Sequence, residues 1–325
     1  MKYHDRIYGA AEITAPVLLD SMQSNAVQRL CGVLQHGITA LLHITSPTTR
    51  FEHSVGVMLL TQRLGAALKE QIAALLHDVS HTAFSHVIDY VFDGHERQSY
   101  HEEKKAEYLA TTDLPTLLSK HGYDWRDFID ETGYPLLEQP APALCADRLD
   151  YFLRDSFDLG LATAHDLSNV LAHLVVHHGC IAVDDLSTAR WMAETYLAAD
   201  RASWANFREV GLYELTARAL RTALEHGVIH ETDLWSMDEA LWQKLHAHNN
   251  STLQQQLRLI SPQTRFARDE VAPDFRVRAK LRTIDPHVLH DGKLFLLSEL
   301  DKKFARRRQQ YLEAQSGVWP MRIIS

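Results

Sequence analysis

The chain lacks the long apolar segment that a membrane span requires. No stretch of its 325 residues approaches about 18 consecutive apolar side chains, and residues 1–13 have no apolar signal core. Three cysteines, Cys31, Cys145 and Cys180, are too few and too scattered for a disulfide framework. These absences predict a cytoplasmic protein in a reducing compartment, with no membrane partner.

Glycine and proline are also scarce. With 14 Gly and 10 Pro in 325 residues, an all-β fold rich in tight turns and a low-complexity chain are both disfavoured. The content of 46% hydrophobic and 23% charged residues is instead typical of a globular protein with a substantial core.

Helical periodicity dominates most of the sequence. Apolar residues recur at helical spacing over residues 18–37, which predicts one helix that ends at a glycine. Residues 46–70 open with Ser, Pro and Thr, which are typical of helix starts, so His53 is expected in the first turns of the next helix. An almost wholly apolar helix is predicted over residues 71–79, and residues 166–260 are expected to be helical throughout.

Side chains that bind divalent metals occur at three separate places: His53, the adjacent pair His77 and Asp78, and Asp147. Neighbouring residues on a helix point about 100° apart, so the pair can share an ion only if it lies between their two directions. A His from an earlier helix and an Asp from a later one would complete a shell of nitrogen and oxygen donors. Such a shell suits one Mn, Fe, Zn, Co, Ni or Mg ion better than a closed thiolate zinc site does. The pattern therefore predicts hydrolysis at a divalent metal.

Charge is unevenly distributed along the chain. The formal net charge is -9, yet residues 271–325 hold 11 Lys and Arg against 6 Asp and Glu. Residues 275–282 alternate apolar and cationic side chains, and this period of two predicts a strand with one cationic face. That face would either be solvated or attract a nucleic acid or a regulatory nucleotide. The four cations are Arg276, Arg278, Lys280 and Arg282.

Five segments, in this order, resemble the motifs of the HD-domain phosphohydrolases, and most closely those of the deoxynucleoside triphosphate triphosphohydrolase branch. They are QRLCGVLQHG, TRFEHSVGV, QIAALLHDVSHTAFSH, YHEE and DRLDYFLRD, and together they cover most of residues 25–160. A lone His-Asp dipeptide carries little weight, whereas this ordered set is highly specific. The family's HDLGHGPFSH is replaced by HDVSHTAFSH here, and its DKWDY by DRLDY.

The resemblance assigns roles to particular residues. The implied ligands of one divalent metal ion are His53, His77, Asp78 and Asp147. The implied catalytic residues are His81 and His101. The positions that match contacts with substrate phosphate and sugar are Arg50, Arg148, Tyr151 and Asp155. Arg148 stands where the family often has a lysine, and its planar guanidinium does not replace an ammonium group one for one.

The expected fold is mainly all-α: an HD-domain helical bundle with further helices and a small C-terminal β element. Three regions are predicted. Residues 1–165 would form the metal-dependent phosphohydrolase core, residues 166–270 a helical extension packed on it, and residues 271–325 a basic strand and helix region.

The resemblance further implies a nucleotide substrate and a homo-oligomer, a dimer or higher. The expected reaction converts a deoxynucleoside triphosphate to the deoxynucleoside and tripolyphosphate. Nucleoside monophosphates, signalling nucleotides and other phosphate esters stay open as alternative substrates. A nucleic-acid-binding or regulatory module that uses the basic strand stays open as an alternative of a different class.

Overall fold

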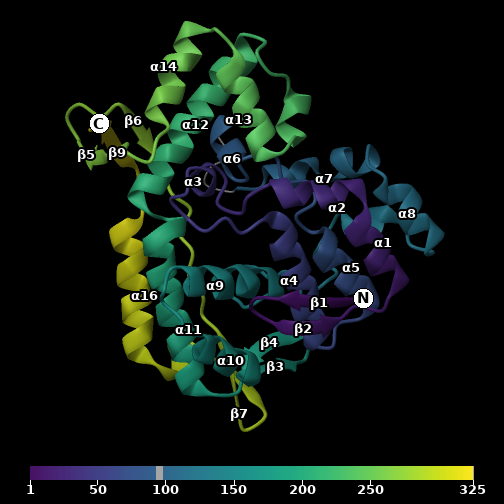
Figure 1. Cartoon of the computed structure of the whole chain (residues 1–325). Coiled ribbons are helices and arrows are strands. Elements are labelled where there is room, and N and C mark those ends of the chain that lie inside the picture. The colour runs from purple at the N-terminus through teal and green to yellow at the C-terminus, as the bar shows by residue number, and fades with distance from the viewer. Residues whose placement is uncertain (93–97, 325) are drawn as a thin grey trace.

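The computed structural model describes residues 1–92 and 98–324, and helices make up most of it (Figure 1). The prediction of a mainly α fold is confirmed. The helices are α1 Pro16–Gln23, α2 Asn25–Arg29, α3 Ile38–Leu41, α4 Arg50–Arg63, α5 Leu68–Leu76, α6 Val87–Val91, α7 Tyr100–Ala110, α8 Leu114–Lys120, α9 Ala146–Asp158, α10 Ala164–His173, α11 Leu186–Ala199, α12 Phe207–Glu225, α13 Asp238–Ala247, α14 Ser251–Leu259, α15 Leu297–Leu300 and α16 Lys302–Gln315.

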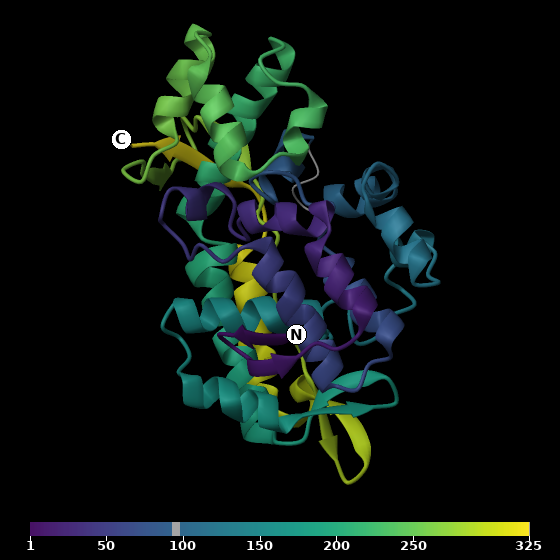
Figure 2. The ribbon, with the colours of Figure 1, turned by 45° about the vertical axis from the view of Figure 1, so that its right-hand side comes forward.

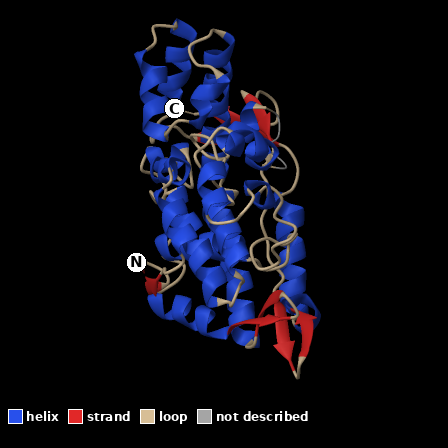
Figure 3. Cartoon of the chain, turned by 90° about the vertical axis from the view of Figure 1, so that its right-hand side faces the viewer, coloured by secondary structure: helices blue, strands red, loops and turns tan. Residues whose placement is uncertain are grey.

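Short strands form three small sheets in the described part of the chain. The strands β1 and β2 make an N-terminal hairpin, a second sheet has the order β3-β4-β7-β8, and a third has the order β5-β9-β6. Figure 3 shows the latter two sheets at opposite ends of the helical body. The strands are β1 Lys2–Asp5, β2 Gly9–Glu12, β3 Leu174–His177, β4 Cys180–Val183, β5 Phe266–Arg268, β6 Phe275–Val277, β7 His287–His290, β8 Lys293–Leu296 and β9 Trp319–Ile323.

The expectation that residues 166–260 are helical throughout is wrong at one hairpin. The strands β3 and β4 pair in antiparallel register, with His177 opposite Cys180. His178 and Gly179 lie between them with φ values of 49° and 75°. Two consecutive residues with positive φ form the kind of turn that matches the twist of a two-residue hairpin. The β-branched residues on either side suit strands, and this turn decides between strand and helix.

The single helix predicted over residues 18–37 is two helices. Ser24 has extended backbone angles, and its side chain accepts a hydrogen bond from the backbone N–H of Val27, which begins α2. Beyond α2 a 3-10 turn over Leu30–Gly32 ends this helical stretch, and the chain then reaches Gly37, where φ is 52°. A Cβ at Gly37 would overlap the carbonyl oxygen of Phe84, so this glycine permits close backbone contact. It directly precedes α3 and does not end the predicted helix.

The strand predicted over residues 275–282 is much shorter than expected. Only Phe275–Val277 form β6, which pairs with β9. Residues 278–286 have no regular secondary structure and lead to β7. The predicted single cationic face is therefore wrong, because the four cations no longer share one strand.

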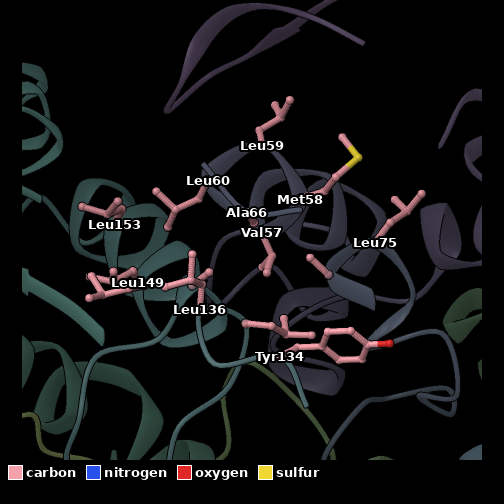
Figure 4. Close-up of a cluster of buried hydrophobic side chains, with 14 of the residues drawn as sticks. Val57, Met58, Leu59, Leu60, Ala66, Leu75, Tyr134, Leu136, Leu149 and Leu153 are labelled. Carbon is pink, nitrogen blue, oxygen red and sulfur yellow. The ribbon is translucent and has the colours of Figure 1, made fainter. Parts of the chain in front are cut away.

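A hydrophobic core fixes the helices that carry the predicted metal ligands. Apolar side chains of α4, α5 and α9 meet in it, together with residues of the loop before α9 (Figure 4). Leu60, Leu75 and Leu149 are each at most 1% exposed. Full burial of a leucine contributes about 1.5–3 kcal/mol, so a handful of such contacts sets how α4 and α9 lie against each other.

Two buried apolar clusters account for most of the interior. One contains α4, α5, α9 and α11, and the other contains α6, α12, α13 and α14, at the end of the molecule seen in green in Figure 2. Each cluster contains residues from more than one of the three predicted regions. The boundaries of those regions stay predictions. Among the described residues, no helix has the length and apolar character needed to cross a membrane.

Candidate metal centre and active site

Three segments that are distant in the sequence bring imidazoles and carboxylates to one point. His53 lies in the first turn of α4, His77 directly follows α5, and Asp147 lies in the first turn of α9. Nε2 of His53 is 3.2 Å from Nε2 of His77 and 2.9 Å from Oδ1 of Asp147. Asp78 completes the group: its Oδ2 is 3.5 Å from Nε2 of His53, and its Oδ1 is 3.6 Å from Nε2 of His77. We call these four side chains, His53, His77, Asp78 and Asp147, the donor cluster.

The opposite ring nitrogens of both histidines are already engaged. Nδ1 of His53 is 2.8 Å from Oδ2 of Asp150, and Nδ1 of His77 is 2.7 Å from the carbonyl oxygen of Ala74. Because both Nδ1 atoms donate to these acceptors, both Nε2 atoms present lone pairs. Two lone pairs facing each other beside two carboxylates repel one another unless a cation lies between them. The donor cluster therefore fits a divalent ion with nitrogen and oxygen ligands.

The electrostatics of the donor cluster lead to the same conclusion. Burial lowers the pKa of His77, but Asp78 and Asp147 outweigh it and raise this pKa to about 10. Burial also acts to raise the pKa of Asp147, but hydrogen bonds with His53 and His77 outweigh it and hold the carboxyl well below its usual range. Positive charge is thus favoured at the centre of the cluster, whether a proton or a metal ion supplies it.

Local sequence explains why α4 carries His53 to this point. Thr49 caps the helix, and its backbone N–H donates to the side chain of Glu52 in a capping box, as the Ser, Pro and Thr residues before the helix predicted. One turn after His53, Gly56 faces α9: a Cβ there would overlap Nη2 of Arg154 and Oδ1 of Asp150. A glycine at this position lets α4 and α9 approach closely.

Three further histidines form a group that begins at Asp78. Nε2 of His81 is 3.1 Å from Oδ1 of Asp78, the rings of His81 and His101 stack with centroids 3.8 Å apart, and His86 meets His81 edge-on at 5.0 Å. Burial, together with the charge of Arg50, lowers the pKa of His81 to about 3. Burial also holds the pKa of His86 and of His101 well below the usual value, so burial disfavours the charged form of all three imidazoles. Nδ1 of His81 and Nδ1 of His101 have no hydrogen-bond partner among the described residues.

A cavity of about 220 Å³ opens beside the donor cluster. Its walls come from every region of the chain, since residues of the loop after α2, of α9, of α12 and of the segment after β6 all contribute. The predicted site residues that line it are Arg50, Asp78, His81, His101, Asp147, Arg148, Tyr151 and Asp155. His53 and His77 are buried, and both contact Asp147. The structure thus brings together every residue that the motifs single out, and their individual roles stay predictions.

One wall of the cavity is aromatic. Its rings belong to Tyr151, Tyr196, Trp204 and Tyr213. Trp204 ends a π-helical turn that extends α11, and its Nε1 donates to Oδ2 of Asp155 at 2.6 Å. The other oxygen of Asp155 is 2.9 Å from Nε2 of His36. The wall offers flat rings with polar tips, a combination that suits a base or a sugar. No motif marks Trp204, which sequence reasoning missed.

The two predicted phosphate-binding arginines are engaged by the protein itself. Nη1 of Arg50 donates to Oδ2 of Asp78 at 2.5 Å, and its Nε donates to Oγ of Ser85 at 3.1 Å. Arg148 points its Nη1 at the carbonyl oxygens of Ala143 and Gln139, at 2.6 and 3.2 Å. Both line the cavity, yet both already serve as internal hydrogen-bond donors.

Comparisons with known proteins identify the family. The model of the HD domain matches residues 50–155. The protein YdhJ of Bacillus subtilis is 39% identical, and the match covers 98% of each chain. A metal-dependent phosphohydrolase of Cordyceps militaris, cns2, is 38% identical over 95% of this chain and 91% of its own length. The chain belongs to the HD-domain family. It is a metal-dependent phosphohydrolase.

Other likenesses of this HD phosphohydrolase are more distant. A homolog of the deoxynucleoside triphosphate triphosphohydrolase SAMHD1 from Dictyostelium discoideum is 27% identical over 52% of this chain and 38% of its own length. A solved phosphohydrolase from Bacteroides thetaiotaomicron superposes with a TM-score of 0.66 at 18% identity, over 93% of this chain and 94% of that one. A hypothetical protein from Aquifex aeolicus gives a TM-score of 0.69 at 21% identity, over 97% and 98% of the two chains. The two structures share the fold.

The basic segment of this HD phosphohydrolase is placed differently from the prediction. Lys280 and Arg282 line the cavity, whereas Arg276 is half exposed and its Nη1 lies 3.7 Å from Glu270. The chain has left the strand by residue 278, so the alternation that predicted one cationic face does not extend to Lys280 and Arg282. The support for a nucleic-acid-binding face is therefore lost. Sequence reasoning found these cations but not their position, because no local pattern shows that they reach the site.

Proposed function

We propose that this chain hydrolyses nucleotides, with deoxynucleoside triphosphates as substrates and the deoxynucleoside and tripolyphosphate as products. The metal would be held by the donor cluster, His53, His77, Asp78 and Asp147. One observation carries the proposal: two imidazole nitrogens lie 3.2 Å apart beside two carboxylates, next to a cavity with an aromatic wall. The motif resemblance and the SAMHD1 relative support the choice of substrate.

The reaction breaks the bond between the α-phosphorus and the 5′ oxygen of the sugar. Water adds to the phosphorus, the electron pair of the broken bond stays on the 5′ oxygen, and that oxygen takes up a proton. A bound divalent ion lowers the pKa of water and offsets the charge of the phosphate. The aromatic wall, with Tyr151 and Trp204, would hold the nucleoside.

His81 is suited to donate that proton once substrate is bound. Burial and Arg50 hold its pKa at about 3, which makes it a neutral base in this state. A phosphate anion in the cavity favours the protonated form of His81 and raises its pKa from this low value. A histidine that titrates near neutral pH transfers protons efficiently. His101, stacked on His81, is the second candidate for this role.

The cavity volume favours a second candidate substrate. At about 220 Å³ it is smaller than the roughly 300–1,000 Å³ typical of ligand pockets. A compact ester, such as a nucleoside monophosphate, would fill it more closely than a triphosphate, and would release orthophosphate instead of tripolyphosphate. The identity of the released phosphate therefore separates the two candidates.

The test is a substrate screen of metal-loaded protein, with deoxynucleoside triphosphates and monophosphates resolved by ion-exchange chromatography. Tripolyphosphate is the expected product, and turnover is expected to fall to background in Asp147→Asn. Asp158→Asn removes a carboxylate that pairs with Arg6 at the end of the same helix; it is the matched control and should keep full activity. Failure to turn over any nucleotide would refute the proposal.

Two further expectations accompany this function. We infer a dimer or higher assembly from the resemblance to the triphosphohydrolase branch, and light scattering on the purified protein would measure it. A cytoplasmic location stays a prediction that rests on the sequence.

A further inference from the structure

The segment between β6 and β7 forms part of the active-site wall. Residues 278–286 have no regular secondary structure, and Lys280, Leu281, Arg282 and Thr283 line the same cavity as Arg50 and His81. This segment lies far downstream of the motifs and outside residues 50–155, the range of the HD match. It therefore supplies the cavity with two cations that the family motif does not contain.

Hydrogen bonds hold this segment in place on both sides of Arg282. The backbone N–H of Arg282 donates to Oδ2 of Asp200 at 3.0 Å, and the hydroxyl of Tyr311 donates to the same oxygen at 2.7 Å. Nε of Arg308 donates to Oγ1 of Thr283 at 3.0 Å. These contacts come from α16 and from the turn that extends α11. Contacts with α16 and with the turn after α11 thus fix the position of Arg282.

The guanidinium of Arg282 contacts only neutral oxygens in the described part of the chain. Nη2 donates to Oε1 of Gln98 at 2.5 Å, and Nη1 donates to the carbonyl oxygen of Lys280 at 3.3 Å. No carboxylate of a described residue lies within 4.0 Å of it. The arginines around the donor cluster differ: Arg50 pairs with Asp78, Arg148 with Glu138, and Arg154 with Asp150 and Asp5.

The positive charge of a guanidinium that lines a cavity without a carboxylate partner is not compensated by the protein. Removing a cation from water costs several kcal/mol unless an anion compensates it. Planar guanidinium groups bind phosphate oxygens in a two-pronged geometry, and Lys280 adds a second positive charge two residues away. The shape and charge of this wall therefore match a phosphate group.

We propose that Arg282, with Lys280 beside it, forms an anion subsite that binds a phosphate group of the substrate and positions it against the donor cluster. This inference rests on the proposed function and deepens it. It assigns the main phosphate contact to Arg282 instead of Arg50 and Arg148, which already pair with carboxylates. The subsite selects substrates by a phosphate group and is indifferent to the base.

The test compares Arg282→Gln with wild type in the metal-loaded full chain, using inorganic phosphate as the probe in titration calorimetry. Loss of a charged hydrogen-bond donor is expected to weaken phosphate binding by about ten- to a hundredfold. With a hydrolysed nucleotide, KM should rise by a similar factor while kcat changes little, and Arg282→Lys should restore part of the affinity. Arg276→Gln removes an equal charge four residues before the subsite in sequence. It should leave both measurements unchanged.

Unchanged phosphate affinity in Arg282→Gln would overturn the subsite even if the wild type hydrolyses nucleotides. Conversely, an enzyme that turns over no nucleotide but loses phosphate affinity in this variant would refute the proposed function and retain the subsite. Should Arg282→Gln fail to fold, Lys280→Gln carries the same test, because it leaves the contacts of Arg282 with Asp200 and Gln98 in place. Phosphate affinity equal to that of wild type would then reject the subsite.

Discussion

Asp150 governs the geometry of the donor cluster without belonging to it. Its carboxylate meets Nδ1 of His53 at 2.8 Å, Nε of Arg154 at 2.8 Å and the hydroxyl of Tyr8 at 2.8 Å. The residue is fully buried. Burial acts to raise its pKa, but Arg154 and His53 outweigh it and hold the carboxyl below its usual value. A permanently ionised Asp150 keeps Nδ1 of His53 protonated, and thereby keeps Nε2 free for a metal.

We expect Asp150→Asn to weaken metal binding by about ten- to a hundredfold, the usual effect of losing a hydrogen-bond partner behind a ligand. The amide has the same shape but no charge, so it orients the imidazole less firmly. Arg154 keeps its pairing with Asp5, which limits the loss of stability. Titration of the metal-free protein with Mn²⁺ measures the change, and Asp158→Asn serves as control. Equal affinities in the two variants would contradict this account of Asp150.

At the residue scale, the donor cluster could be predicted because each member lies in a local motif of fixed spacing. His53 follows a helix start, and the pair His77 and Asp78 ends an apolar helix. Arg282 and Trp204 could not be placed in this way. Trp204 reaches the cavity through its contact with Asp155, and Arg282 through its contact with Asp200, and no short stretch of sequence encodes either contact.

Gly56 controls the separation of the helices α4 and α9. We expect Gly56→Ala to lower the free energy of unfolding by about 1–3 kcal/mol, the usual cost of overpacking. This would occur although alanine favours a helix over glycine by about 1 kcal/mol. The new methyl group would overlap Arg154 and Asp150, which are at most 1% exposed and have no room to move. Metal affinity should fall in the same variant, because α9 also carries Asp147.

Denaturant unfolding and metal titration test this prediction, with Gly133→Ala as the control. Gly133 has open space around its Cβ position, so its change should stay within about 0.5 kcal/mol. A Gly56→Ala variant that is as stable as wild type and binds metal equally well would show that the two helices can separate without consequence.

At the element scale, helices with clear start signals could be predicted, and elements decided by distant contacts could not. The capping box at Thr49 and Glu52 is legible in the sequence and begins α4 where expected. The strands β3 and β4 depend on a two-residue turn inside a region of mixed propensity. The strand β6 ends at Val277, which pairs with Trp319, the first residue of β9. No residue of β9 remains to pair with residue 278.

Metal binding should stabilise the whole molecule, since the donor cluster joins α4, the end of α5 and α9. We expect a chelator to lower the melting temperature of the metal-loaded protein by a few degrees. A ligand present at 100 times its dissociation constant stabilises by about 2.7 kcal/mol. Differential scanning calorimetry with and without chelator measures the shift. Asp147→Asn should not respond, and a wild type that is equally insensitive would count against a metal in the donor cluster.

At the scale of the molecule, the sequence predicts a mainly α protein but not how its ends are used. The N-terminal hairpin supports the donor cluster indirectly: Asp5 pairs with Arg154, which pairs with Asp150, the hydrogen-bond partner of His53. In the last helix, α16, Tyr311 donates a hydrogen bond to Asp200, which accepts the backbone N–H of Arg282. Neither the contact of Asp5 with Arg154 nor that of Tyr311 with Asp200 has a local signature, since both join residues more than 100 positions apart.

Because residues 280–283 line the cavity, the HD-matched region alone does not contain the whole site. A recombinant fragment limited to residues 50–155 would retain His53, His77, Asp78 and Asp147. It would lack Trp204 and Arg282, which line the cavity.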